Sequence, residues 1–260
     1  MDLILDLHPA FALTLLCSIT VLISYMGLKI VRKYYTEDVL KQNHEVGGFI
    51  FNAFGIIYAV LVAFVVFATW EEYDNSKKNV EIESIELADI FNNSKALPEP
   101  YRQQVIPLLR KYTEDVINDE WKLLEQGEPS EKAKESFTNI WTFFATMDRA
   151  LIKNEIAYQE TLKHLNDAGE RRRMRIFDSS NNIPGIIWVV LLFGSVVTVI
   201  YTYFFYAKNI IHQFVMTSAL TVLNTLILYM ILILDNPFSG YIKIDAKPFE
   251  YVIQLLNRGM

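Results

Sequence analysis

Residues 46–75 decide the fold, and they read VGGFIFNAFGIIYAVLVAFVVFATWEEYDN. The first 25 of these residues carry no charge and end at Trp70. At about 1.5 Å per residue they form a helix of ~37 Å, which exceeds the ~30 Å hydrocarbon core of a bilayer. We therefore predict a membrane span from about Val46 to Trp70, with part of the helix projecting beyond the bilayer.

Three further apolar runs predict three more spans, at about Pro9 to Val31, about Pro184 to Ala207 and about Phe214 to Leu234. Aromatic or basic residues close the first and third runs, as is typical of membrane interfaces. The link between the last two runs is very short, which predicts an antiparallel hairpin. The predicted fold class is an all-α membrane protein with four transmembrane helices.

Between the second and third runs the composition becomes that of a soluble helical domain. Helical spacing of apolar residues, interrupted at Leu97–Pro100 and at Gly127–Ser130, predicts helices over about 74–95, 101–126, 130–147 and 155–177. The predicted organisation is a first transmembrane hairpin at 1–71, a helical extramembrane domain at 72–182, a second hairpin at 183–235 and a C-terminal tail at 236–260.

Composition and motifs exclude several classes of function. The net charge of −6 and the lack of a basic stripe argue against a nucleic-acid partner. The single cysteine, Cys17, allows no disulfide or cysteine metal site within one chain, and the four histidines have no partner spacing. Metalloprotease, phosphate-loop, nucleophile-elbow and dinucleotide motifs are missing from the sequence. We therefore expect no enzymatic activity, no cofactor and no metal.

With four spans, both termini and the inserted domain lie on one side of the membrane. Basic residues near the membrane are more numerous beside the domain and in the tail than in the short links. The positive-inside rule then favours a cytoplasmic inserted domain.

The second span carries the candidate functional residues. Ala53, Ile57, Leu61, Phe64 and Ala68 fall on one helical face, with Phe54 beside them. Apolar rings of this kind can gate conduction by dewetting, and the amide of Asn52 can meet an ion. The alternative is that the aromatic residues only pack against other helices or lipid. The candidate pore-lining or neck residues are Asn52, Ala53, Phe54, Ile57, Leu61 and Phe64.

Two charge clusters are each open to two interpretations. Arg171, Arg172, Arg173 and Arg175 precede the third span, where they either anchor the chain at anionic headgroups or line an electropositive vestibule. Acidic residues follow the second span and form either a solvated helix face or a cation-selective ring: Glu81, Glu83, Glu86 and Asp89.

Two stretches together resemble the bestrophin anion channels, and more closely the bestrophin-like domain family of bacterial and plant membrane proteins. Tyr58 to Asn75 is similar to the second bestrophin helix, whose apolar neck leads into a tryptophan and a Tyr-acid-Asn element. The motif after the last helix, with Asp235, Pro237, Phe238 and Gly240, is similar to the Pro-Phe-Gly element of that family. The dense acidic run that binds calcium in the animal channels is missing, and Ile57 and Leu61 stand where the family has phenylalanine.

The resemblance implies a homo-oligomer, with a pentamer favoured, around a pore lined by the second helix, and a cytoplasmic inserted domain. The predicted function is an ion channel for anions such as chloride, with the lipid bilayer and small inorganic ions as partners and the bacterial inner membrane as location. The alternatives are a cation channel and a membrane-anchored scaffold with a protein-binding helical domain.

Overall fold

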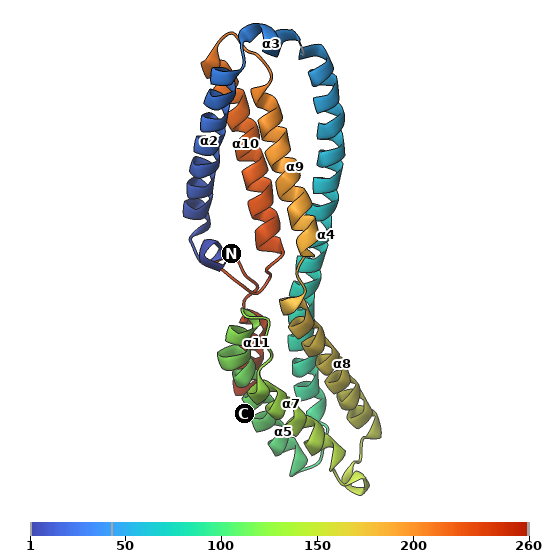
Figure 1. Ribbon diagram of the computed structural model, residues 1–260. Helices are drawn as coiled ribbons and strands as arrows, with labels where there is room; N and C mark the ends of the chain where they lie inside the picture. Colours follow the sequence, from blue (N-terminus) through green and yellow to red (C-terminus); the bar gives the residue numbers. More distant parts are fainter. Residues whose placement is uncertain (1, 43, 259–260) are drawn as a thin grey trace. The chain divides into compact units, whose positions relative to one another are not determined.

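The computed structural model describes residues 2–42 and 44–258, and all regular elements in this part of the chain are helices. Residues 1–71 and 183–235 form one compact unit, and residues 72–182 and 236–260 form a second. We call them the span unit and the helical unit, and each is described by itself (Figure 1).

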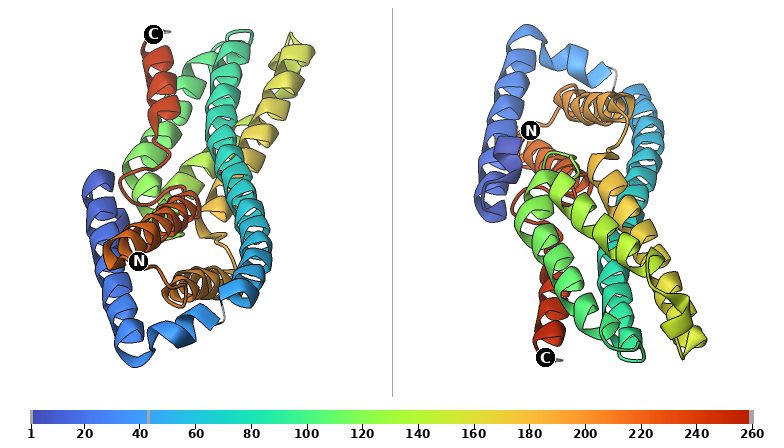
Figure 2. Two further views of the ribbon diagram at one scale, coloured as in Figure 1. Left: turned by 90° about the horizontal axis from the view of Figure 1, so that it is seen from above. Right: turned by 90° about the horizontal axis from the view of Figure 1, so that it is seen from below.

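The span unit contains α1 (Asp2–Leu5), α2 (Pro9–Tyr34), α3 (Glu37–Gln42), the first part of α4 (His44–Ser94), α9 (Gly185–Tyr203) and α10 (Ile210–Leu234). Within the described residues, α2, α4, α9 and α10 are long and apolar enough to cross a membrane. They lie in the order α2, α10, α9, α4 (Figures 1 and 2). The two consecutive spans α2 and α4 are therefore not a closely packed pair, because α3 separates them and α9 and α10 lie between them.

Hydroxyl and amide side chains tie α2, α9 and α10 together. Thr20 and Thr225 hydroxyls lie 3.0 Å apart, and the Thr221 hydroxyl donates to Ser24 at 3.3 Å. The Asn224 amide donates to the Thr198 hydroxyl at 3.1 Å. Hydrogen bonds of this kind between helices are a recurrent source of cohesion in a medium where the hydrophobic effect between helices is absent.

Helix α4 is continuous from His44 to Ser94. The helix predicted over about 74–95 is therefore the second part of α4 and not a separate element. No glycine or proline occurs between Gly55 and Pro98, so nothing in the backbone ends the helix when the composition turns polar. A pair such as Lys78 and Asp74, with Nζ and Oδ2 2.6 Å apart, supports the polar half at the i,i+4 spacing.

The helical unit contains the second part of α4, α5 (Tyr101–Asp115), the π-helical turn η1 (Val116–Glu120), α6 (Trp121–Leu124), α7 (Glu131–Ala145), the 3₁₀ turn η2 (Arg149–Leu151), α8 (Glu155–Ser180) and α11 (Lys247–Arg258). Its core includes Leu87, Leu109, Ile140 and Leu165, all fully buried. Ser130 and Asn154 cap α7 and α8 by accepting backbone N–H groups.

The C-terminal tail belongs to the helical unit. Phe249, Val252 and Leu256 fall on one face of α11, are fully buried, and complete the same core. Helix α11 packs against α5. The tail is therefore a structural element of this unit, which its separation from 72–182 in the sequence did not predict.

Candidate functional site

One face of the α4 span is packed against α9. The Tyr58 hydroxyl donates to the Leu191 carbonyl at 2.9 Å, and the Tyr58 ring lies over Gly194, where an added Cβ would stand 2.3 Å from the ring. Phe51 stacks on Tyr201 with ring centroids 5.4 Å apart. Glycine at position 194 is needed for this close approach, and the contact fixes the rotation of α4 about its own axis.

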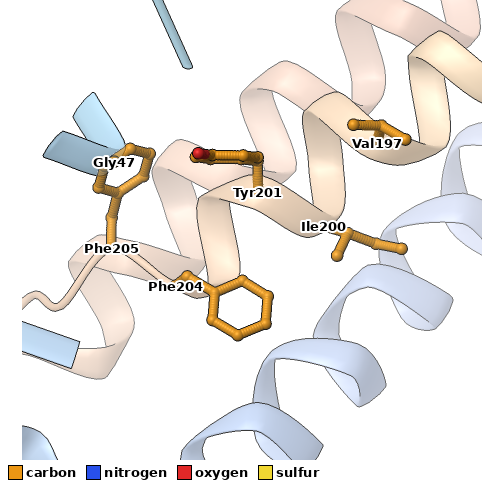
Figure 3. A pocket seen from close by; sticks show the side chains of 6 residues that line it. All are labelled: Gly47, Val197, Ile200, Tyr201, Phe204 and Phe205. Carbon is orange, nitrogen blue, oxygen red and sulfur yellow. The ribbon is translucent and has the colours of Figure 1, made fainter. Parts of the chain in front are cut away.

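The start of α4 meets the end of α9 at an apolar hollow of about 370 Å³ (Figure 3). The Phe205 ring lies beside Gly47 (Figure 3). The rings of Tyr201 and Phe205 both contact the Phe51 ring, and both residues line the hollow. A Cβ at Gly47 or Gly48 would be 4.0 Å from the Phe205 ring, which is ordinary contact. A larger residue at either position would therefore not clash with the Phe205 ring, so the packing here does not require glycine.

A second face of the α4 span has no cover among the residues that the structure describes. Ile57 and Phe64 are 71% and 70% exposed, and Asn52 and Ala53 are exposed as well. Phe54 and Leu61 are half-buried, because they lie toward the packed face. Ile57 and Phe64 are seven residues apart, so they lie about 10 Å apart along the helix. The structure thus groups Ala53, Ile57 and Phe64 on one uncovered apolar stripe and sets Phe54 and Leu61 at its edge.

Arg172 and Arg175, two of the four arginines before the third span, are buried. For these two side chains, the headgroup anchor and the electropositive vestibule are therefore both wrong. Arg175 is fully buried and donates through Nε to Glu83 Oε2 at 2.8 Å and through Nη2 to Glu120 Oε1 at 2.8 Å. Arg172 Nη2 donates to Glu120 Oε2 at 2.5 Å. A side chain enclosed in the core of the helical unit contacts neither headgroups nor a vestibule.

We call Arg172, Arg175, Glu83, Glu120 and Tyr112 the buried charge cluster. Its two cations and two anions balance. Burial disfavours the charged guanidinium, but the carboxylates of Glu83 and Glu120 outweigh this and raise the pKa of Arg175 above its ordinary value. Burial and the negative charge of Glu83 raise the pKa of Tyr112 well above its ordinary value, so its hydroxyl stays protonated and donates to Glu83 Oε1 at 2.5 Å.

The remaining charged candidates are distributed differently. Arg171 is half-buried and donates through Nη1 to the side-chain amide oxygen Oδ1 of Asn79 at 3.1 Å, whereas Arg173 is exposed. In the acidic run, Glu83 belongs to the buried charge cluster and Glu86 Oε2 lies 2.6 Å from His164 Nδ1. A wholly solvated acidic face is therefore wrong for these two carboxylates.

The motif after α10, predicted as the element beyond the last span, is structural in both units. In the span unit, Asp235 accepts the Ile183 N–H at 2.6 Å and the Trp188 indole N–H at 3.1 Å. Burial raises the pKa of Asp235, and these two donors act in the opposite direction.

In the helical unit, the Pro237 carbonyl accepts the Ile244 N–H at 2.8 Å, and the buried Phe238 ring lies 6.0 Å from the Trp121 ring. Gly240 has φ of +79°, which favours glycine. The motif therefore joins the end of α10 to the start of α9 through Asp235, and it positions the tail in the helical unit through Pro237 and Phe238.

Glu120 and Tyr112 were missed in the sequence because nothing sets them apart within their predicted helix. A signal did exist on α8. Leu165, Ala168, Arg172 and Arg175 recur at the spacing of one buried helical face, so the pattern itself indicates the burial of two arginines. Among residues 2–42 and 44–258, no group of three or more His, Cys, Asp or Glu side chains is placed to hold a metal ion.

Four long apolar helices define this chain as an all-helical integral membrane protein. A family model described as the Bestrophin-like domain matches residues 14–249. The chain therefore belongs to the Bestrophin-like family.

Solved structures with the same fold include bacterial proteins of low sequence identity. A bestrophin homolog from Klebsiella pneumoniae is 12% identical with a TM-score of 0.72, and the match covers 92% of this chain and 97% of that one. A tryptophan-to-alanine variant of that homolog is 12% identical with a TM-score of 0.73, and the match covers 93% of this chain and 96% of that one. A structure described as a membrane protein with a proline-to-alanine substitution is 11% identical with a TM-score of 0.75, and the match covers 93% of this chain and 97% of that one. No curated protein sequence matches the chain.

Proposed function

We propose that the chain forms a homo-oligomeric ion channel, with five copies around a central pore lined by the α4 span. One observation carries the proposal: α4 is locked on one face by Tyr58 and Gly194 and leaves Ile57 and Phe64 uncovered on the other. A helix fixed in this way presents the same residues in every copy. The membership in the Bestrophin-like family and the bacterial bestrophin homolog fold support the same assembly.

In the proposed pore, each copy contributes Ala53, Ile57 and Phe64 to the wall, with Asn52 nearer the entrance. Rings of large apolar side chains hold little water and therefore resist ions unless the pore is wide enough to stay wet. The neck is then formed at Ile57 and Phe64, and Phe54 and Leu61 fill the joint between neighbouring α4 helices.

The test is conductance of the purified protein in planar bilayers. Ile57→Ala and Phe64→Ala widen the proposed neck, so we expect larger single-channel currents than in the wild type. Leu22→Ala is the matched control, because Leu22 is an exposed apolar residue of α2 outside the proposed pore. The absence of current under all salts together with a monomeric mass, or equal effects of all three substitutions, overturns the proposal.

We further propose that the pore prefers anions and that the helical unit is cytoplasmic in the bacterial inner membrane. The basic residues of the domain flanks support this orientation. Of the four arginines before the third span, only Arg173 is exposed to act on ions in solution. In a salt gradient the reversal potential then shifts toward the chloride potential, and Arg173→Glu reduces that shift. A reversal potential that shifts instead toward the equilibrium potential of the cation identifies a cation channel.

Orientation has a separate assay, since Cys17 is the only cysteine. A chain with Cys17→Ser and Lys153→Cys, the second at an exposed position, is expected to resist a membrane-impermeant maleimide in intact cells and to react after permeabilisation. Labelling of intact cells places the helical unit outside.

A further inference from the structure

The span unit contains an open cavity of about 600 Å³ that is lined mainly by α2, α9 and α10. On α10 it extends from Thr221 to Leu232, which lie eleven positions and about 16 Å apart along the helix axis. This length matches the ~15 Å depth of one leaflet of the hydrocarbon core. The volume lies within the range of ordinary small-molecule sites.

The cavity opens sideways, between α2 and α9. The residues at its mouth are exposed, among them Ile23, Leu192 and Val196. The residues at its floor are buried, among them Ser24 and Thr221, which are bonded to each other. A molecule therefore enters from the outer surface of the three helices, which in a membrane protein is the surface toward lipid or a neighbouring subunit.

One polar group of the wall is unused. Tyr229 is only 6% exposed, and its hydroxyl has no hydrogen-bond partner among the residues that the structure describes. The hydroxyl oxygen is not one of the enclosed unbonded atoms of the described residues, so it is open to an occupant of the cavity. A hydroxyl without a partner is costly where no water is at hand. Tyr229 is five residues from the end of α10 at Leu234, about 8 Å inside that end. A ligand oxygen that accepts from Tyr229 thus lies below headgroup level.

The wall also excludes a class of ligand. The lining residues that the structure describes are all uncharged, and the polar groups among them are hydroxyls, a Trp188 indole N–H already bonded to Asp235, and the backbone. A phosphate or ammonium headgroup finds no counter-ion among these residues.

We propose that this cavity binds an uncharged single-chain lipid, with its hydrocarbon along α10 and one carbonyl or ether oxygen accepting from Tyr229. The site is separate from the proposed pore face of α4, and the inference does not depend on ion conduction.

Trp188 borders the cavity and provides the assay, since bromine atoms on an acyl chain quench tryptophan fluorescence on contact. The full chain carries Trp70→Phe, to remove the other tryptophan of the spans, and is placed in phosphatidylcholine vesicles. Titration with a brominated monoacylglycerol is expected to give saturable quenching. Tyr229→Phe removes one hydrogen bond and is expected to raise the half-saturation concentration about two- to ten-fold.

Val196→Phe blocks the mouth and is expected to abolish the saturable phase. Val189→Phe is the matched control, because Val189 is an equally exposed valine of α9 outside the cavity, and it should leave the phase intact. Linear quenching that is the same in both phenylalanine variants overturns the proposal. Equal saturable quenching by brominated phosphatidylcholine also overturns it, since the occupant is then an ordinary bilayer chain.

Discussion

Glu83→Gln is expected to destabilise the helical unit by several kcal/mol. Glu83 is fully buried, its two oxygens accept from Arg175 at 2.8 and 3.0 Å, and Oε1 also accepts from Tyr112. At 2.8 Å and an effective dielectric constant of 20, the gross attraction between unit charges is about 6 kcal/mol. Glutamine keeps the volume but removes the charge, and it turns an amide donor toward the guanidinium donors.

After this change two cations face one anion in the buried charge cluster. The desolvation of the charges offsets part of the gross attraction in the native protein, so the net loss is smaller than the Coulomb figure. Breaking a buried pair by removing one partner costs about 3–5 kcal/mol. A loss of about 4 kcal/mol corresponds to an opening equilibrium about a thousand-fold more favourable.

The assay is hydrogen exchange by mass spectrometry on the full chain in detergent, read from peptides of α8 around Arg175. Glu81→Gln is the control, because Glu81 lies two residues away on α4, is exposed, and its carboxylate lies 4.0 Å from Lys77 Nζ. An exposed pair of this kind contributes at most about 1 kcal/mol. Equal exchange in the two glutamine variants refutes the reasoning.

A double variant sharpens the test. Glu83→Leu with Arg175→Met replaces the pair by apolar groups of similar size, and such replacements are often neutral or stabilising. The double variant is therefore expected to exchange more slowly than Glu83→Gln, while the pair of Arg172 and Glu120 stays balanced. Losses that simply add in the double variant contradict an ion-pair account.

Three further substitutions test the packing that positions the candidate site. Gly194→Ala places a methyl group against the Tyr58 ring and is expected to cost about 1–3 kcal/mol, seen as a lower Tm in detergent, with partial recovery in a Tyr58→Ala background. Asp235→Ala removes the acceptor of two donors and is expected to lower the Tm, whereas an unchanged Tm would show that water replaces it. Phe249→Ala opens a cavity in the core and is expected to cost about 3–5 kcal/mol in hydrogen exchange of the helical unit, while Tyr251→Ala, at an exposed position, leaves exchange unchanged.

Much of the architecture follows from the amino-acid sequence alone. Uninterrupted apolar runs predicted helices at Pro9, Val46, Pro184 and Phe214, and the helices α2, α4, α9 and α10 begin within four residues of those positions. The reason is that a span must satisfy its own backbone in lipid, so length and composition alone determine the element. The helix predicted over about 74–95 is continuous with the second span, since a change of composition does not end a helix that lacks a glycine or proline.

The candidate site was predictable only in part. Helical periodicity grouped Ala53, Ile57 and Phe64, and the structure leaves this stripe uncovered. Whether copies of the chain enclose the stripe stays a prediction. Helical periodicity did not predict that Arg175 pairs with Glu83, because the two residues are 92 positions apart along the chain.

The sequence by itself determined that the chain is an integral membrane protein and where its long apolar helices lie, because that outcome depends on local hydrophobicity along a single helix. Only the tertiary structure decided which face of α4 is covered, which arginines lose contact with water, and where α2, α9 and α10 leave a cavity beside Tyr229. Each of these depends on side chains that meet across distant helices, and such pairings are set by packing and charge balance in three dimensions.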